Sequence, residues 1–323
     1  RFHEIGGPEV LKIEEIAVRQ PQKGEIAIDV VAVGLNRAES MFFHGHYIEQ
    51  PKLPSGLGYE AVGKITAVGQ DVDPSLIGRR VGTIPGFSMN DYPVFAEKAI
   101  VPAHEIAELP PTLSDVDCAA VWMQYTTAYG ALVELGKVRP GDFVLITAAS
   151  SSVGLAAIQI TKAQGAVAIA TTRTSSKKQQ LLDLGADYVI ATEEEDLPAC
   201  VTEITKGKLA RIVFDPVGGD YVNLLAQATA FEGTIFLYGM LSGKPTSYPM
   251  SGIGKGVALT FYLLTQTKTP ERLERMKRYI YDRLADGTFK PKVDRVFRFE
   301  EVVEAYTHLE SNQQVGKIVI TLG

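Results

Sequence analysis

A segment near the middle of the chain carries the residue types that could hold a phosphate group. Residues 144–166, "VLITAASSSVGLAAIQITKAQGA", read as an apolar strand, a loop of small residues and a helix. Such a segment begins a dinucleotide site when its loop follows the glycine pattern G-x-G-x-x-G. Here Ala149 and Ser151 stand at the first two glycine positions, and only Gly154 is kept. The question is whether this serine-containing loop still binds a nucleotide.

The loop keeps the features that a phosphate needs. Gly154 stands where the helix packs closely on the strand, and a Cβ would collide there. The start of the helix offers unpaired N–H groups and the positive end of its dipole, to which serine hydroxyls add further donors. We therefore expect Ser151, Ser152 and Val153 to contact a nucleotide. The alternative is an ordinary strand-to-helix turn that binds nothing.

The end of the next strand indicates which nucleotide fits. In an NAD site, a carboxylate about 20 residues beyond the loop takes the ribose 2′-OH. Here the strand ends in "ATTRTSSKK", and no acid follows before Asp183. Thr172, Arg173 and Lys177 supply donors and positive charge instead, which suits a 2′-phosphate. Cations at a helix start oppose its dipole unless an anion binds, so we expect NADPH; a solvated basic helix start is the alternative.

The surrounding elements predict two domains. From residue 121, apolar strands alternate with helices, which is typical of a doubly wound parallel sheet covered on both faces. The first 120 residues instead contain short alternating strands separated by glycines, as in an antiparallel, barrel-like β domain. After residue 269 come a helix over 270–287, a strand, a helix over 300–311 and a strand. We expect residues 121–269 to bind the nucleotide, and 1–120 with 270–323 to form the other domain.

Composition and charge limit the class of protein. The chain has 323 residues, of which 46% are hydrophobic and 22% charged, as in an ordinary globular protein. Its net charge of -6 provides no basic surface for nucleic acid or an anionic membrane. No apolar run approaches the roughly 20 residues of a membrane span. Cys118 and Cys200 are the two cysteines, and nothing near Arg1 resembles a signal peptide, so we expect a cytoplasmic protein.

Several longer stretches resemble one known family. They are "VVAVGLNRAE", "GHYIEQPKLPSGLGYEAVGKITAVGQDV", "YTTAYGAL", "AASSSVGLAAIQI", "FDPVGG", "FLYGMLSG" and "LESNQQVGKIVI". Together they resemble the medium-chain dehydrogenase/reductase superfamily, and within it the zinc-independent, zeta-crystallin-like NADPH:quinone oxidoreductases. The resemblance covers essentially the whole chain. It implies a GroES-like β-barrel domain that carries the substrate site and a Rossmann domain that binds NADPH.

The sequence also indicates whether the protein binds zinc. Zinc-dependent members carry a cysteine near the position of Ala38, and a histidine where this chain has Tyr59. They also carry a four-cysteine lobe, which is excluded because no cysteine precedes Cys118. His44 and His46 form an H-x-H pair without a third ligand nearby. We therefore expect no metal.

Without a metal, the site suits the reduction of a conjugated carbonyl, because hydride addition then develops an enolate-like charge that hydrogen bonds stabilise. The resemblance places Asn36 and Tyr47 beside the nicotinamide, so both are expected donors, and Tyr47 could also pass a proton to the product. The alternatives are that Asn36 caps a turn and that Tyr47 is a pocket wall. Met41 replaces a tyrosine of close quinone reductases, which leaves the acceptor open.

The resemblance implies further cofactor contacts. Residues that follow the strand ends should contact the ribose and the carboxamide. Lys317 should reach the adenosine phosphates. The implied contacts are Thr127, Val217, Gly239, Met240 and Lys317. Thr192 stands where the family often places an aromatic residue against adenine, so stacking should be weaker.

Three functions remain open at this point. The first is an NADPH-dependent reductase of quinones or other conjugated carbonyls. The second is an enoyl reductase acting on α,β-unsaturated aldehydes, ketones or thioesters. The third, of another class, is a non-enzymatic NADPH-binding protein.

The assembly can also be predicted. The stretch "GVALTFYLL", residues 256–264, reads as an edge strand that is apolar on both faces. Exposed edges are usually covered or paired, so we expect a homodimer that joins two sheets edge to edge. The alternative is that this stretch is an internal helix.

Overall fold

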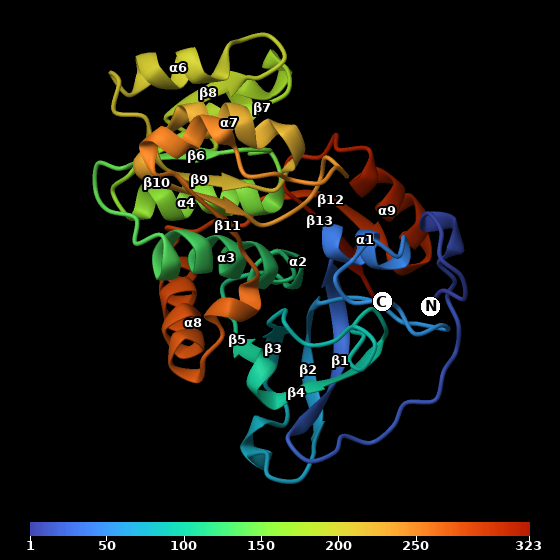
Figure 1. Cartoon of the computed structure of the whole chain (residues 1–323). Helices are drawn as coiled ribbons and strands as arrows, with labels where there is room; N and C mark the ends of the chain where they lie inside the picture. The colour runs from blue at the N-terminus through green and yellow to red at the C-terminus, as the bar shows by residue number, and fades with distance from the viewer. The chain divides into compact units, whose positions relative to one another are not determined.

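The computed structural model describes residues 1–323 and contains two compact units (Figure 1). The β unit comprises Arg1–Met123 and Tyr281–Gly323, and the α/β unit comprises Gln124–Ile280. The chain leaves the β unit close to the expected boundary at residue 120. It returns later than residue 270, because a single helix, α8 (Pro270–Ala285), continues through the boundary.

The β unit is built on one seven-stranded sheet, in which neighbours follow the order β12-β13-β1-β2-β3-β5 and β4 pairs with β1. Only β12 and β13 are parallel to each other; the other pairs are antiparallel. Because β13 pairs with β1, residues that follow the α/β unit in the chain complete the sheet of the β unit. The strands are β1 (Glu25–Gly34), β2 (Glu60–Val68), β3 (Arg80–Thr83), β4 (Lys98–Pro102), β5 (Ile106–Glu108), β12 (Val293–Arg298) and β13 (Lys317–Thr321).

Aromatic side chains fill much of the core under three helices of this unit. The helices are α1 (Arg37–Phe43), α2 (Asp115–Cys118) and α9 (Val302–Glu310). Phe42 and Phe43 of α1 contact different aromatic partners. Phe42 packs edge-on against Phe2, with ring centroids 5.8 Å apart, and Phe43 packs edge-on against Tyr306 of α9, with centroids 5.2 Å apart. These contacts fix α1 against the N-terminal segment and α9.

The α/β unit contains a six-stranded sheet in the order β11-β10-β9-β6-β7-β8, with every neighbouring pair parallel. The chain begins at β6 in the middle, winds outward to β8, then continues from β9 to β11 on the other side. The predicted fold class, a doubly wound parallel sheet beside a mainly antiparallel β unit, is confirmed. The strands are β6 (Phe143–Ile146), β7 (Val167–Thr172), β8 (Tyr188–Ala191), β9 (Ala210–Asp215), β10 (Thr229–Leu237) and β11 (Ala258–Phe261).

Helices connect these strands. They are α3 (Trp122–Tyr129), α4 (Ser152–Ala163), α5 (Lys178–Asp183), α6 (Leu197–Ile204) and α7 (Val222–Ala228). A 3-10 turn, Ser175–Lys177, leads into α5. The strand expected within 256–264 is confirmed as β11, which lies at the sheet edge and pairs with β10 alone. None of the helices combines the length and the apolar character that a membrane span requires.

Candidate functional site

The switch point of the parallel sheet lies between β6 and β9, where the two halves diverge. In open α/β sheets, ligands bind outside the carboxyl ends of the strands at such a point. Helix α4 starts here, and the Ser151 hydroxyl caps it by accepting the N–H of Gly154 at 3.1 Å. A Cβ on Gly154 would lie 2.6 Å from Ala149 Cα, so only glycine allows this helix to approach the loop. Ser152 and Val153 form the first turn, whose N–H groups lack intrahelical partners.

The two predicted cations follow the neighbouring strand, β7. Lys177 Nζ lies 3.5 Å from Ser150 Oγ, so this ammonium reaches the loop before α4. Arg173 comes directly after Thr172, the last residue of β7; its side chain is exposed and its guanidinium forms no ion pair or hydrogen bond within the chain. The structure therefore places Lys177 at the loop and leaves Arg173 open to solvent beside it.

Sequence reasoning missed an acid in this region. Glu194, after β8, accepts hydrogen bonds from the Ser175 N–H at 2.9 Å and the Ser175 hydroxyl at 3.3 Å. Between the end of β7 and Asp183 the chain itself contains no acid. Parallel strands bring the loops that follow them to one edge, so the acidic run directly after β8, at residues 193–195, was the signal in the sequence.

The loops after β9 and β10 are held together at the same edge. The Leu241 N–H donates to Pro216 O and the Ser242 N–H to Val217 O, each at 2.9 Å. A Cβ on Gly239 would lie 2.9 Å from Pro216 O, so these two chain segments approach as closely as glycine allows. Val217, Gly239 and Met240 are thereby brought together, as expected. Thr127 lies half-buried on α3.

A buried aspartate links chain segments at this edge by hydrogen bonds. Asp215, the last residue of β9, accepts hydrogen bonds from the Thr147 hydroxyl and from the Gly218 N–H, the latter at 2.8 Å. Burial raises the pKa of this carboxyl, against which the bonds from Thr147 and Gly218 act. The side chain ties the end of β6 to the loop after β9 across the switch point.

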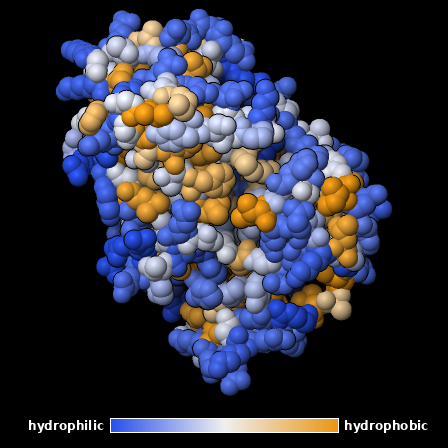
Figure 2. Space-filling model, viewed as in Figure 1, coloured by the Kyte–Doolittle hydropathy of each residue, from blue (hydrophilic) through white to orange (hydrophobic).

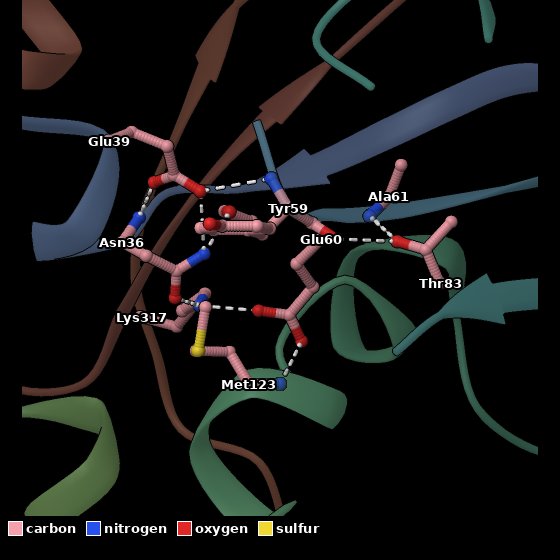
Figure 3. Close-up of polar contacts among 9 residues, drawn as sticks. Asn36, Glu39, Tyr59, Glu60, Ala61, Thr83, Met123 and Lys317 are labelled. Carbon is pink, nitrogen blue, oxygen red and sulfur yellow. Dashed lines mark hydrogen bonds and ion pairs between the residues drawn. The ribbon is translucent and has the colours of Figure 1, made fainter. Parts of the chain in front are cut away.

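In the β unit, two of the predicted residues, Asn36 and Lys317, lie in a buried polar cluster, shown in Figure 3. Lys317 Nζ donates to Glu60 Oε2 at 2.5 Å and to Asn36 Oδ1 at 2.6 Å, and the three residues are buried. Asn36 Nδ2 donates to Gly34 O and to Glu39 Oε1, each at 3.0 Å. Every polar atom of the Asn36 amide group thus has a partner inside the protein.

Two expected roles do not fit this arrangement. Asn36 was expected to donate to a substrate, but its amide hydrogens are already used and its side chain is buried at the start of α1. Its role is the alternative one, a cap: its backbone N–H donates to Glu39, three residues later. Lys317 was expected to meet phosphates, but its ammonium is 1% exposed and paired with Glu60.

Glu39 is the second carboxylate of the cluster. It accepts the Asn36 N–H and side-chain amide, and the Tyr59 N–H at 3.1 Å. Burial raises the pKa of Glu39 to about 7, although the bonds from Asn36 and the charge of Lys317 act in the opposite direction. This carboxyl therefore titrates near neutrality inside the core.

Tyr47, the other predicted catalytic residue, follows α1 and remains half-buried. Its ring centroid lies 6.2 Å from that of Tyr59. Burial raises the pKa of both phenols above the usual value of 10, so both are protonated at neutral pH. Tyr47 thus has the exposure that a donor needs and Asn36 does not.

The histidines of the H-x-H pair contact each other, and His44 contacts Glu310. His44 Nε2 is 2.9 Å from Glu310 Oε1, and the His44 and His46 rings stack with centroids 6.2 Å apart. No three His, Cys, Asp or Glu side chains are grouped so that they could hold a metal ion.

Known proteins resemble the chain over its whole length. The family model described as alcohol dehydrogenase GroES-like domain matches residues 22–111, and that described as zinc-binding dehydrogenase matches residues 152–278. The quinone oxidoreductase of Salmonella typhimurium is 31% identical, covering 99% of this chain and 98% of its own. The 2-haloacrylate reductase of a Burkholderia species is 26% identical, covering 99% and 97%. The solved structure of Escherichia coli quinone oxidoreductase complexed with NADPH is 31% identical, covers 99% and 98%, and has a TM-score of 0.91.

The two units and these matches define the class, a medium-chain dehydrogenase/reductase with a GroES-like unit and a Rossmann unit. Within that class, the chain belongs to the quinone oxidoreductase family and is an oxidoreductase. The resemblance noted in the sequence is confirmed.

Proposed function

We propose that this protein transfers hydride from NADPH to a quinone or another conjugated carbonyl. The observation that carries the proposal is the start of α4, where Ser151 caps the helix and Lys177 reaches the loop before it. The N–H groups at the helix start fit a pyrophosphate, and the ammonium beside the loop fits the adenosine 2′-phosphate. The E. coli relative, whose structure was solved with NADPH, supports the choice of cofactor.

The cofactor is held along the carboxyl edge of the parallel sheet. Ser151, Ser152 and Val153 bind the pyrophosphate, while Thr172, Arg173 and Lys177 receive the adenosine 2′-phosphate. On the other side of the switch point, the nicotinamide and its ribose meet Thr127, Val217, Gly239 and Met240. NADPH, when bound, supplies the hydride.

Tyr47 donates the hydrogen bond that stabilises the developing enolate-like charge, and then its proton. Its raised pKa keeps the phenol protonated at neutral pH. Asn36 acts only by fixing the start of α1, the helix that precedes Tyr47.

The reaction is metal-independent. Tyr59 stands where zinc-dependent members have a histidine, and a phenol with a raised pKa is a poor ligand. The Lys317 ammonium already supplies the positive charge beside Glu60 and Asn36. These residues do not fit a zinc ion. Treatment with a chelator should leave activity unchanged, and one zinc per chain lost together with activity would contradict this.

The test is a panel of quinones, enals and enones, with NADPH oxidation followed by its absorbance. Acceptor-dependent oxidation is expected, fastest with a quinone. An enoyl reductase is the second candidate, favoured by the match to 2-haloacrylate reductase. Turnover only with enals, enones or thioesters would identify it. NADPH binding without turnover of any acceptor would identify a non-enzymatic binding protein.

We also propose a homodimer formed through the edge strand β11. Figure 2 shows a hydrophobic area over β10 and β11, and Phe261 of β11 is 41% exposed, with Phe231, Met250 and Ile253 more exposed still. Two such edges could continue one sheet across a two-fold axis. Phe261→Lys should give monomers in light scattering; Tyr262 is unsuitable for this test because it is fully buried. A wild type that is monomeric, or a variant that stays dimeric, would contradict the proposal.

A further inference from the structure

We propose that Glu60 is a positioning residue for the cofactor: its carboxylate holds the first turn of α3 and thereby sets the place of Thr127. This inference rests on the proposed function, in which Thr127 contacts the nicotinamide end of NADPH. It assigns a task to a buried carboxylate that the hydride-transfer reaction does not otherwise use.

The two carboxylate oxygens of Glu60 have different partners, as Figure 3 shows. Glu60 is the first residue of β2 and is fully buried. Its Oε2 accepts a hydrogen bond from Lys317 Nζ at 2.5 Å, and its Oε1 accepts one from the Met123 N–H at 3.1 Å. Lys317 Nζ also donates to Asn36 Oδ1. The ion pair thus fixes the carboxylate, and the carboxylate fixes the backbone of Met123.

The bond to Met123 caps a helix. Met123 is the second residue of α3, and the first N–H groups of a helix have no partner inside it. A carboxylate satisfies one of these donors, and its charge interacts favourably with the positive end of the helix dipole. Val121, which precedes the helix, has no side-chain acceptor, and the cap comes from a residue 63 positions away. The start of α3 therefore depends on a distant carboxylate.

The segment that leads into α3 also packs closely on the same cluster. A Cβ on Gly34, the last residue of β1, would collide with Ala119 O and would lie 2.7 Å from Lys317 Cε. Only glycine allows the chain before α3 to approach β1 this closely. Close packing and the hydrogen bond from Met123 thus act together on the start of the helix.

The position of Thr127 follows from this start. Thr127 lies one helical turn after Met123, on the same face of α3. Between them, the buried Tyr125 donates a hydrogen bond to Gln159 Oε1 of α4 at 2.9 Å. That bond holds α3 at one point, and a second point is needed to fix the direction of the helix axis. Glu60 supplies the second point.

The test compares two double variants that both lack the buried ion pair. Glu60→Gln with Lys317→Met keeps an amide oxygen that can accept the Met123 N–H, whereas Glu60→Leu with Lys317→Met removes the acceptor at similar volume. Fluorescence titration should show NADPH binding about fivefold weaker with Glu60→Leu than with Glu60→Gln, as expected for the loss of one helix cap. 2′-Phospho-ADP-ribose, which has no nicotinamide, should bind both double variants equally.

Two controls separate positioning from a general loss of stability. Asp73→Ala removes an exposed cap in the β unit, where Asp73 accepts the Ser75 N–H at 2.9 Å, and should leave both affinities unchanged. When Thr127→Ala is added to each double variant, the difference in NADPH affinity between them should vanish, because Glu60 acts through Thr127.

A further replacement leaves the buried side chains unchanged. Met123 is exchanged for its α-hydroxy acid, which puts an ester oxygen in place of the N–H and so removes only the donor. If the variants of Glu60 do not fold, this protein should show the same selective loss of NADPH affinity relative to wild type.

A second measurement needs no cofactor. Amide hydrogen exchange at Met123 should be faster with Glu60→Leu than with Glu60→Gln, each combined with Lys317→Met, because only the amide oxygen can protect this N–H.

Several results would overturn the inference. They are equal NADPH affinities in the two double variants, an equal loss for 2′-phospho-ADP-ribose, a difference that persists with Thr127→Ala, an equal exchange rate at Met123, and the same loss in Asp73→Ala. A wild type that binds no NADPH would overturn the proposed function as well. The two failures can be distinguished, because amide exchange reports the cap whether or not the cofactor binds.

Discussion

The polar groups of the two units of this oxidoreductase differ in exposure and in hydrogen bonding. At the carboxyl edge of the α/β unit, Arg173 is exposed and has no partner, and the first turn of α4 presents free N–H groups. In the β unit, Asn36, Glu60 and Lys317 are buried, and the Lys317 ammonium donates hydrogen bonds to both of the others. Donors without partners are available to a ligand, whereas satisfied buried groups hold a structure in place. Residue type alone does not distinguish the two, since both regions offer a lysine.

The largest effect should come from breaking the buried pair. Lys317→Met leaves Glu60 buried without its counter-charge, which we expect to lower the free energy of unfolding by about 3 to 5 kcal/mol. Urea unfolding measures this. The double variant Lys317→Met with Glu60→Gln should recover part of the loss, and a single variant as stable as wild type would show that the pair is not needed.

The next effect concerns Glu39 and pH. Its folded pKa of about 7 lies above the usual value of 4.5. Its contribution to stability is therefore fully present below pH 4.5 and is lost as pH rises through 7. Relative to that of Glu39→Gln, the free energy of unfolding of the wild type should fall by about 2 to 3 kcal/mol between about pH 5 and pH 8.

Urea unfolding at these two pH values tests the prediction. Glu304→Gln, an exposed change on α9, is the control and should show no such trend. A constant difference between wild type and Glu39→Gln would contradict it.

At the open edge, the effect should be on binding and not on stability. NADPH should bind at least about tenfold tighter than NADH, about 1.4 kcal/mol, and Arg173→Ala should remove this difference. Fluorescence titration with both cofactors measures it. Arg278→Ala, an exposed change on α8, should keep the preference. Equal affinities in the wild type would refute the assignment of Arg173.

The smallest effect should come from Glu194. Its carboxylate occupies the Ser175 donors that a 2′-phosphate could use, and its charge repels that phosphate. Glu194→Gln should strengthen NADPH binding about threefold, less than 1 kcal/mol, with little change for NADH. Glu193→Gln, the adjacent exposed acid, is the control, and a gain of the same size in both variants would indicate only a general charge effect.

The sequence predicted what depends on local pattern. Strand β11, helix α4 and the close packing at Gly154 all follow from periodicity or from a short motif, and the structure confirms them. The contacts of the other predicted residues depend on partners that are far away in the sequence. Lys317 and Asn36 are 281 positions apart, and no local signal indicates that one neutralises a cluster containing the other. Glu194 was missed for the same reason, because it meets Ser175 only through the pairing of β7 with β8.

The place of β13 in the β unit has a consequence for biosynthesis. On the ribosome, β1 and β2 are made before the α/β unit, and β13, which carries Lys317, is made after it. Until then, β1 has β2 and β4 as neighbours but lacks β13, and Glu60 and Asn36 lack the cation that pairs with them. The α/β unit, whose six strands are consecutive, can fold as it emerges. We therefore expect the β unit to complete its fold second.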